Sequence, residues 1–134
     1  MKFLLDANAV IALMKGDDGF MAQLKQHRPR DFGMPSIVAH ELFYGAFRSQ
    51  RVAENLARVE ALQFEVMDFT PEDARRAAQI RSRLAAAGTP IGPYDVLIAG
   101  QALARGLTLI THNTREFQRV AELKLADWQA KPGP

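Results

Sequence analysis

Short apolar segments alternate with amphipathic stretches along this chain, and this alternation constrains the fold more than any other feature. The brief apolar segments predict strands over residues 2–5, 31–35, 64–69, 107–111 and 123–125. Apolar spacing between them predicts helices over residues 7–15, 18–26, 37–48, 52–62, 71–87, 93–105 and 115–120. Strands separated by helices are typical of a parallel sheet covered on both faces. The sequence therefore predicts an α/β fold of three layers with a four- or five-stranded parallel sheet.

Capping residues mark two of the helix starts. Ser36 is predicted to cap helix 37–48. Thr70 is followed by Pro71 in the first helical position and by Asp73 three residues later, which is the pattern of a capping box. Most of the acidic residues, Asp73 among them, are explained by such caps or by exposed helix faces.

Length and composition limit the kind of protein this is. The 134 residues suffice for one domain with a sizeable core, which we expect to cover 1–130 and to leave 131–134 as a flexible tail. The chain has no cysteine, which excludes disulfides, thiolate zinc sites and a cysteine nucleophile, and suits a reducing cytoplasm. No apolar run approaches the roughly 20 residues that span a membrane, and no secretion signal is recognisable. We therefore expect a cytoplasmic protein.

The charge of the chain is compatible with a nucleic-acid substrate without requiring one. The formal net charge is only +2. Arginine nevertheless outnumbers lysine by twelve to five, and its planar guanidinium suits phosphates and carboxylates. A solvated surface that favours arginine explains the same composition.

Three carboxylates lie among apolar neighbours, where a charge is costly unless it meets a partner. Asp6 directly follows the first predicted strand, at the edge where ligands bind in parallel α/β sheets. Glu41 borders the inward face of helix 37–48, and Asp95 follows a Gly-Pro turn at a helix start. Each also has a purely structural explanation: Asp6 as an N-cap, Glu41 as a side chain that reaches solvent, and Asp95 as a partner of the helix dipole. Asn8 is predicted to cap the helix that follows Asp6 or to orient Asp6.

Taken together, these three acids suggest a site for a hard cation. Magnesium prefers oxygen ligands and binds through a few carboxylates, waters and phosphate oxygens. Without a cation, clustered carboxylates would repel one another and raise one another's pKa values. The order of the residues in the chain does not show whether the three meet.

Several segments resemble a known family, the PIN-domain ribonucleases, and within it the VapC toxins of bacterial toxin–antitoxin pairs. The matching segments are FLLDANAVIAL, SIVAHELFYGA, AGTPIGPYDVLIAGQALARGLTLITHNTREFQRV and LKLADW. They cover most of the chain in the order and spacing of the family. The run over residues 88–120 is highly specific, whereas the Leu-Asp-x-Asn pattern alone is weak.

The resemblance implies roles for five residues. Asp6, Glu41 and Asp95 correspond to the acidic metal-binding residues of the family. The fourth acidic position falls at Asn113, a poorer cation ligand, and Glu116 one helical turn later could restore the missing charge. Both are expected to tune bound waters from a second layer around the metal. Ala7 stands where the family usually has threonine, so a hydroxyl that could support the site is absent.

The resemblance also implies a reaction and partners. One or two Mg²⁺ or Mn²⁺ ions would hold the scissile phosphate of an RNA and activate a water for in-line attack. A small VapB-like antitoxin would wrap the chain, cover the acidic pocket and present an arginine to it. A homodimer is usual in the family, and Phe43, Phe47, Leu56 and Val59 offer apolar surface for contacts, although core packing explains them as well. Arg81, Arg83 and Arg115 could neutralise flanking phosphates, or could form surface ion pairs instead.

Three other functions remain open from the sequence. Asp6 followed by Asn8 is similar to the nucleophile motif of haloacid-dehalogenase-type phosphoryl-transfer enzymes, although their second Asp and late Lys are missing. A metal-free ribonuclease would use His40 or His112 as general acid and base. The third possibility is a binding module that keeps the fold and uses its acidic pocket to grip a basic partner.

Overall fold

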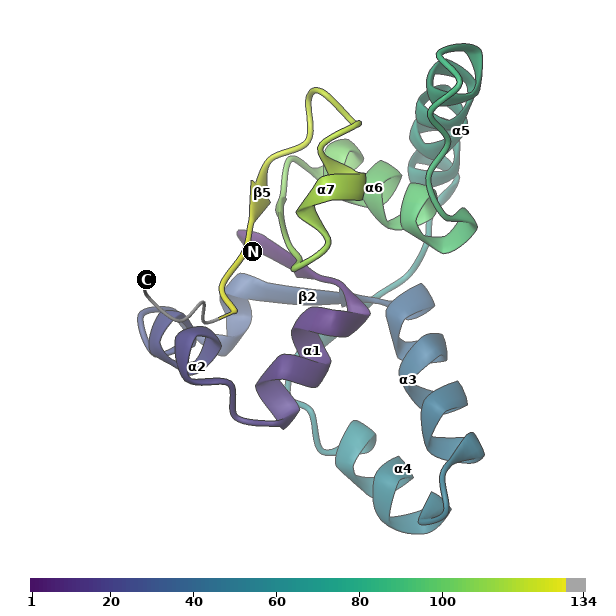
Figure 1. Ribbon diagram of the computed structural model, residues 1–134. Helices are drawn as coiled ribbons and strands as arrows, with labels where there is room; N and C mark the ends of the chain where they lie inside the picture. The colour runs from purple at the N-terminus through teal and green to yellow at the C-terminus, as the bar shows by residue number, and fades with distance from the viewer. Residues whose placement is uncertain (130–134) are drawn as a thin grey trace.

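The structure, a computed structural model that describes residues 1–129, follows the predicted alternation of strands and helices (Figure 1). Its strands are β1 (Phe3–Leu5), β2 (Phe32–Pro35), β3 (Glu65–Met67), β4 (Thr108–Ile110) and β5 (Leu125–Ala126). Its helices are α1 (Ala7–Met14), α2 (Asp18–Leu24), α3 (Ser36–Arg48), α4 (Val52–Glu60), α5 (Pro71–Ala86), α6 (Pro93–Arg105) and α7 (Thr114–Phe117), with a 3₁₀ turn at Pro29–Asp31. The tail predicted at 131–134 lies outside the described residues.

The strands form one sheet in the order β3-β2-β1-β4-β5, and every pair is parallel. The connections from β1 to β2 and from β2 to β3 run one way across the sheet, whereas those from β3 to β4 and from β4 to β5 run the other way. Because such connections are right-handed, the helices of the first two lie on one face of the sheet and those of the last two on the opposite face. Figure 1 accordingly shows α1 to α4 on one face of the sheet and α5 to α7 on the other. The predicted three-layer α/β fold with a five-stranded parallel sheet is confirmed.

The chain leaves β1 and β4 in opposite directions across the sheet, because β1 leads to β2 and β4 leads to β5. Such a reversal opens a crevice at the carboxyl ends of the two strands, where α/β proteins bind ligands. Leu5 pairs with Ile110 at this edge, so the next residues along the chain, Asp6 and Thr111, emerge side by side. The topology therefore places Asp6 at the crevice.

Large apolar side chains from both helical layers pack against the sheet. Those that are almost fully buried include Phe20, Phe32, Phe117, Leu4, Leu5, Ile80, Ile98, Leu109 and Ile110. On the second face, α5 and α6 pack closely because Gly100 has no side chain: a Cβ there would lie 2.6 Å from the Cα of Ala77. This close packing fixes the position of α6, which carries Asp95.

The structure confirms one of the two predicted helix caps and contradicts the other. Thr70 and Asp73 form the predicted capping box, with bonds of 3.2 Å from Asp73 N to Thr70 Oγ1 and 2.9 Å from Thr70 N to Asp73 Oδ2. Ser36, however, is not a cap. Strand β2 continues through Pro35, which becomes the N-cap of α3, and Ser36 is already the first helical residue.

Asp73 has a second role that the capping pattern does not predict, because only 1% of this residue is exposed. Its carboxylate is enclosed between α5 and the end of α6, where Arg105 and Gln101 donate hydrogen bonds to it. Asp73 is therefore a buried charge that joins two helices as well as a cap.

Over residues 1–129, no helix combines the length and the apolar character needed to cross a bilayer.

Candidate active site

Asp6 is held in place by two hydrogen bonds at the carboxyl end of β1. Its Oδ1 accepts a 2.8 Å bond from Ala9 N and thereby caps α1. Its Oδ2 accepts a short bond from the hydroxyl of Thr111, the residue that follows β4. Burial raises the pKa of the Asp6 carboxyl above its usual value, against the effect of these two bonds. Capping and a functional position at the crevice therefore coexist in one side chain, and the exposed Asn8 is not the cap.

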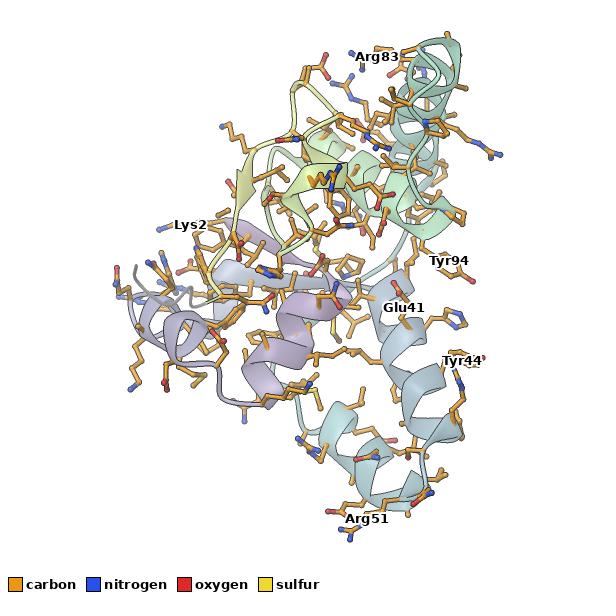
Figure 2. The ribbon with its side chains drawn as sticks, in the orientation of Figure 1. Lys2, Glu41, Tyr44, Arg51, Arg83 and Tyr94 are labelled. Atoms are coloured by element: carbon orange, nitrogen blue, oxygen red, sulfur yellow. The ribbon has the colours of Figure 1, made fainter. Side chains whose placement is uncertain are left out.

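Glu41 lies on α3 and faces the same crevice (Figure 2). It is half-buried. Burial raises the pKa of its carboxyl, and the negative charge of Asp6 raises it further. On the same helix, the Arg48 guanidinium lies 5.3 Å from the centre of the Tyr44 ring.

Asp95 is the third residue of α6 and the acid most affected by its neighbours. Burial raises the pKa of its carboxyl to about 6, with further contributions from the charges of Glu116, Asp6 and Glu41. These effects mean that Asp95 lies within electrostatic range of the other three acids, as Glu41 does of Asp6. The fold therefore brings together Asp6, Glu41, Asp95 and Glu116, which come from four separate segments.

Glu116 and Asn113 connect α7 to the turn that precedes α6. Glu116 Oε1 accepts a 2.6 Å bond from Gly92 N, and its Oε2 accepts a 3.0 Å bond from Asn113 Nδ2. These bonds lower the pKa of the Glu116 carboxyl. Arg119 adds a second link, because its Nη1 donates a 2.9 Å bond to the Pro90 carbonyl. Asn113 and Glu116 thus support the position of Asp95 through the turn that precedes α6.

Two residues that the sequence analysis did not single out, Gly92 and Thr111, also shape the candidate site. A Cβ on Gly92 would lie 3.1 Å from Asp95 Oδ2 and 3.6 Å from Glu116 Oε1, so glycine leaves room for both carboxylates. Thr111 bonds Asp6, and its Oγ1 also accepts a 3.0 Å bond from Asn113 N. The only sequence signals were the Gly-Pro turn and a hydroxyl at the end of an apolar strand.

The donor set suits a divalent cation, although it is not yet arranged as a coordination shell. Within residues 1–129, no three His, Cys, Asp or Glu side chains already have the arrangement of a metal site. In that part of the chain, no protein group donates a hydrogen bond to the carboxylate of Glu41 or Asp95. These oxygens are therefore available to a cation. Burial is the main cause of the raised pKa values of Asp6, Glu41 and Asp95, and neighbouring acids raise those of Glu41 and Asp95 further, so a cation would offset both costs.

The remaining sequence candidates lie around this centre in different environments. Arg83 forms an ion pair with Glu122 at 2.6 Å, as the surface-pair alternative predicted. Arg115 is exposed, and Arg81 lines a hollow between α5 and the start of α6. Val59 is buried in the core, so its assignment to a dimer surface is wrong, whereas Phe47 is exposed.

Both histidines considered for catalysis have partners among the described residues. His112 Nδ1 lies 2.9 Å from Asp127 Oδ2. The ring of His40 packs against the edge of the Tyr94 ring, with the two centres 5.8 Å apart.

The metal-free protein is predicted to become more stable when Asp95 is replaced by asparagine. A raised pKa means that the folded chain holds this proton more tightly than the unfolded chain, so the fold loses stability as the pH rises from 3.8 towards 6. At about pH 7, Asp95→Asn should gain about 1 kcal/mol, a value reduced because the group is half-exposed. Thermal unfolding in EDTA measures this gain, which should vanish near pH 4. An equal gain at both pH values would contradict the explanation.

Comparisons with known proteins agree with this arrangement. The family model of the PIN domain matches residues 3–123. The tRNA(fMet)-specific endonuclease VapC of Shigella flexneri is 38% identical over 130 residues, which are 96% of this chain and 98% of that protein. Ribonuclease VapC2 of Haemophilus influenzae is 32% identical over the same shares of the two chains.

Solved structures show the same likeness in three dimensions. DNA-bound VapBC from Salmonella typhimurium superimposes with a TM-score of 0.89 at 38% identity, over 96% of this chain and 98% of that one. VapBC2 from Rickettsia felis, bound to a promoter DNA fragment, gives a TM-score of 0.88 at 30% identity over 96% and 100%. With a family model spanning nearly the whole chain and relatives above 30% identity, this chain belongs to the PIN-domain family and, within it, to the VapC ribonucleases.

Proposed function

We propose that this chain is a metal-dependent endoribonuclease and the toxin of a toxin–antitoxin pair. The observation that carries the proposal is the convergence of Asp6, Glu41 and Asp95 at the crevice between β1 and β4, with raised pKa values and free carboxylate oxygens on Glu41 and Asp95. Family membership supports the ribonuclease activity. It also argues against the haloacid-dehalogenase-like alternative.

The acidic residues would have different roles in phosphodiester hydrolysis. Asp6, Glu41 and Asp95 would hold one or two Mg²⁺ or Mn²⁺ ions, which when bound lower the pKa of a water and neutralise charge on the phosphate. One of these carboxylates would accept the proton of the attacking water. Asn113 and Glu116 keep the turn before α6 in place and so orient Asp95.

The substrate and partners follow by analogy with the relatives. Two of them carry the name tRNA(fMet)-specific endonuclease, so we propose an RNA substrate with a single-stranded loop, such as a tRNA. The VapBC complexes support a VapB-like antitoxin as partner, whose basic segment would neutralise the acid cluster. We place the chain in the cytoplasm, because its proposed RNA substrate is found there and a chain without cysteine suits a reducing compartment. We also expect a homodimer.

Metal removal tests the mechanism directly. Dialysis against EDTA should reduce cleavage of a transfer RNA to background, and added Mg²⁺ or Mn²⁺ should restore it, because no other group in this proposal activates the water. Cleavage followed on a denaturing gel measures the effect, and Ca²⁺ serves as a control cation of similar charge. Cleavage that persists in EDTA would contradict the metal mechanism and favour catalysis by His40 or His112.

A further inference from the structure

An exposed aromatic surface adjoins the acid cluster, and neither the fold nor the proposed chemistry uses it. It consists of Tyr94 at the start of α6 and of His40, Tyr44 and Arg48 on α3, and we refer to these four residues as the aromatic flank. Tyr94 is 47% exposed and Tyr44 is 56% exposed. Exposed apolar side chains that lie together, rather than singly, can mark a binding site.

The aromatic flank lies next to the acid cluster along two helices. Tyr94 immediately precedes Asp95, and His40 immediately precedes Glu41, so each pair shares one turn of its helix. The contact of 5.8 Å between the ring centres of His40 and Tyr94 joins α3 to α6 beside these acids. Tyr44 lies one helical turn beyond Glu41, and Figure 2 shows Tyr94, Glu41 and Tyr44 in succession along one edge of the molecule.

The chemistry of the flank suits a single-stranded nucleic acid. His40 and Tyr94 pack edge to face at an interplanar angle of 70°, so this contact covers one face of one ring and leaves the other ring faces for stacking. Arg48 adds a positive charge over the Tyr44 ring at 5.3 Å, within reach of a backbone phosphate. Proteins bind unpaired RNA by stacking its bases on aromatic side chains and on arginine while cations follow the backbone.

We propose that the aromatic flank stacks the unpaired bases of RNA that adjoin the phosphate held at Asp6, Glu41 and Asp95. The inference rests on the proposed ribonuclease function and adds to it how the chain selects single-stranded RNA. RNA is favoured over a protein partner because the flank adjoins the acids that would act on the RNA phosphate, and relatives of this chain are ribonucleases. Arg48 adds a positive charge for the RNA backbone.

Binding of short RNAs to full-length protein tests the inference. In the Asp6→Asn background, which keeps the RNA intact, fluorescence anisotropy compares an oligoadenylate with an abasic oligomer of the same length and charge. Tyr44→Ala and Tyr94→Ala should each weaken oligoadenylate binding about tenfold, whereas Tyr44→Phe and Tyr94→Phe should bind within about twofold of the parent because they keep the ring. Binding of the abasic oligomer should be the same for all variants, since it offers no base to stack.

Val66→Ala is the control. It truncates an exposed apolar side chain, 49% exposed, on the edge strand β3 and outside the aromatic flank, and should leave binding unchanged. Unchanged oligoadenylate affinity in the alanine variants would overturn the inference. So would a change in their sedimentation coefficient, which would make the flank an interface between copies of the chain.

Cleavage by the otherwise wild-type chain, measured alongside, separates this inference from the proposed function. RNA cleavage together with unaltered affinity of the alanine variants contradicts the stacking inference alone. A wild-type protein that fails to cleave RNA in Mg²⁺ contradicts the proposed function, and the inference falls with it.

Discussion

Asp6→Asn will lower the rate constant of RNA cleavage about a thousandfold while leaving the fold intact. The loss follows from weaker metal binding, since several kcal/mol of transition-state stabilisation depend on the cation and each 1.36 kcal/mol is a factor of about ten. The fold survives because an asparagine oxygen still accepts the bond from Ala9 N that caps α1. Single-turnover cleavage with Mg²⁺ measures the rate, and circular dichroism monitors the fold.

Asp17→Asn is the matched control for this experiment. Asp17 caps α2 as Asp6 caps α1, through a bond of 2.9 Å from Phe20 N to its Oδ2, but does not contribute to the pKa values of the acid cluster. This variant should cleave RNA at the wild-type rate. Equal background cleavage by wild type and Asp6→Asn would favour a binding module over an enzyme.

Arg105→Met will destabilise the protein by about 2 kcal/mol, which lowers the Tm by about 8 °C for a chain of this size. Arg105 donates bonds of 3.0 Å to Asp73 Oδ2 and 2.9 Å to the Asp68 carbonyl, and methionine keeps the bulk of the side chain without these donors. Asp73 would then be a buried carboxylate with only Gln101 and Thr70 as partners. The value lies below that of a fully buried pair because 32% of the Arg105 side chain is exposed.

The loss should depend on pH in a defined direction. Burial alone would raise the pKa of Asp73, but hydrogen bonds from Arg105 and Thr70 outweigh burial and lower it. The ionised form therefore stabilises the fold above the unfolded pKa, and this contribution disappears as the pH falls through the lower, folded pKa. Thermal unfolding should show the full difference between wild type and Arg105→Met near neutral pH and a smaller difference in acid.

Arg83→Met tests whether burial is the cause. Arg83 and Glu122 also form an arginine–carboxylate pair, but 53% and 48% of their side chains are exposed. Solvent screens such pairs, so the Tm should change little. A similar loss in both variants would mean that the enclosed position of Asp73 does not matter.

Local sequence patterns were sufficient for the secondary structure and for the position of Asp6. Strand and helix periodicity, Pro71 and the Thr70–Asp73 spacing depend on neighbours within one or two helical turns, and the structure has these elements as predicted. Ser36 failed because a strand that runs to Pro35 leaves no residue between strand and helix for a side-chain cap.

Local sequence patterns could not predict the contacts between segments that are far apart in the chain. Thr111 bonds Asp6 across 105 residues, Glu116 bonds Gly92 across 24, and Arg105 bonds Asp73 across 32. The capping pattern around Asp73 predicts its backbone bond correctly, but the same pattern occurs on exposed helices. Only the packing of α6 against α5 makes this carboxylate a buried charge.

The sequence by itself determined the alternation of strands and helices, the parallel sheet and the presence of an acid directly after the first strand, because these depend on side-chain periodicity and on the order of elements along the chain. The tertiary structure decided which acids share one electrostatic environment. Whether Asp6, Glu41, Asp95 and Glu116 interact depends on the pairing of β1 with β4 and on the docking of α3, α6 and α7, and electrostatic coupling falls with distance in space rather than with separation along the chain.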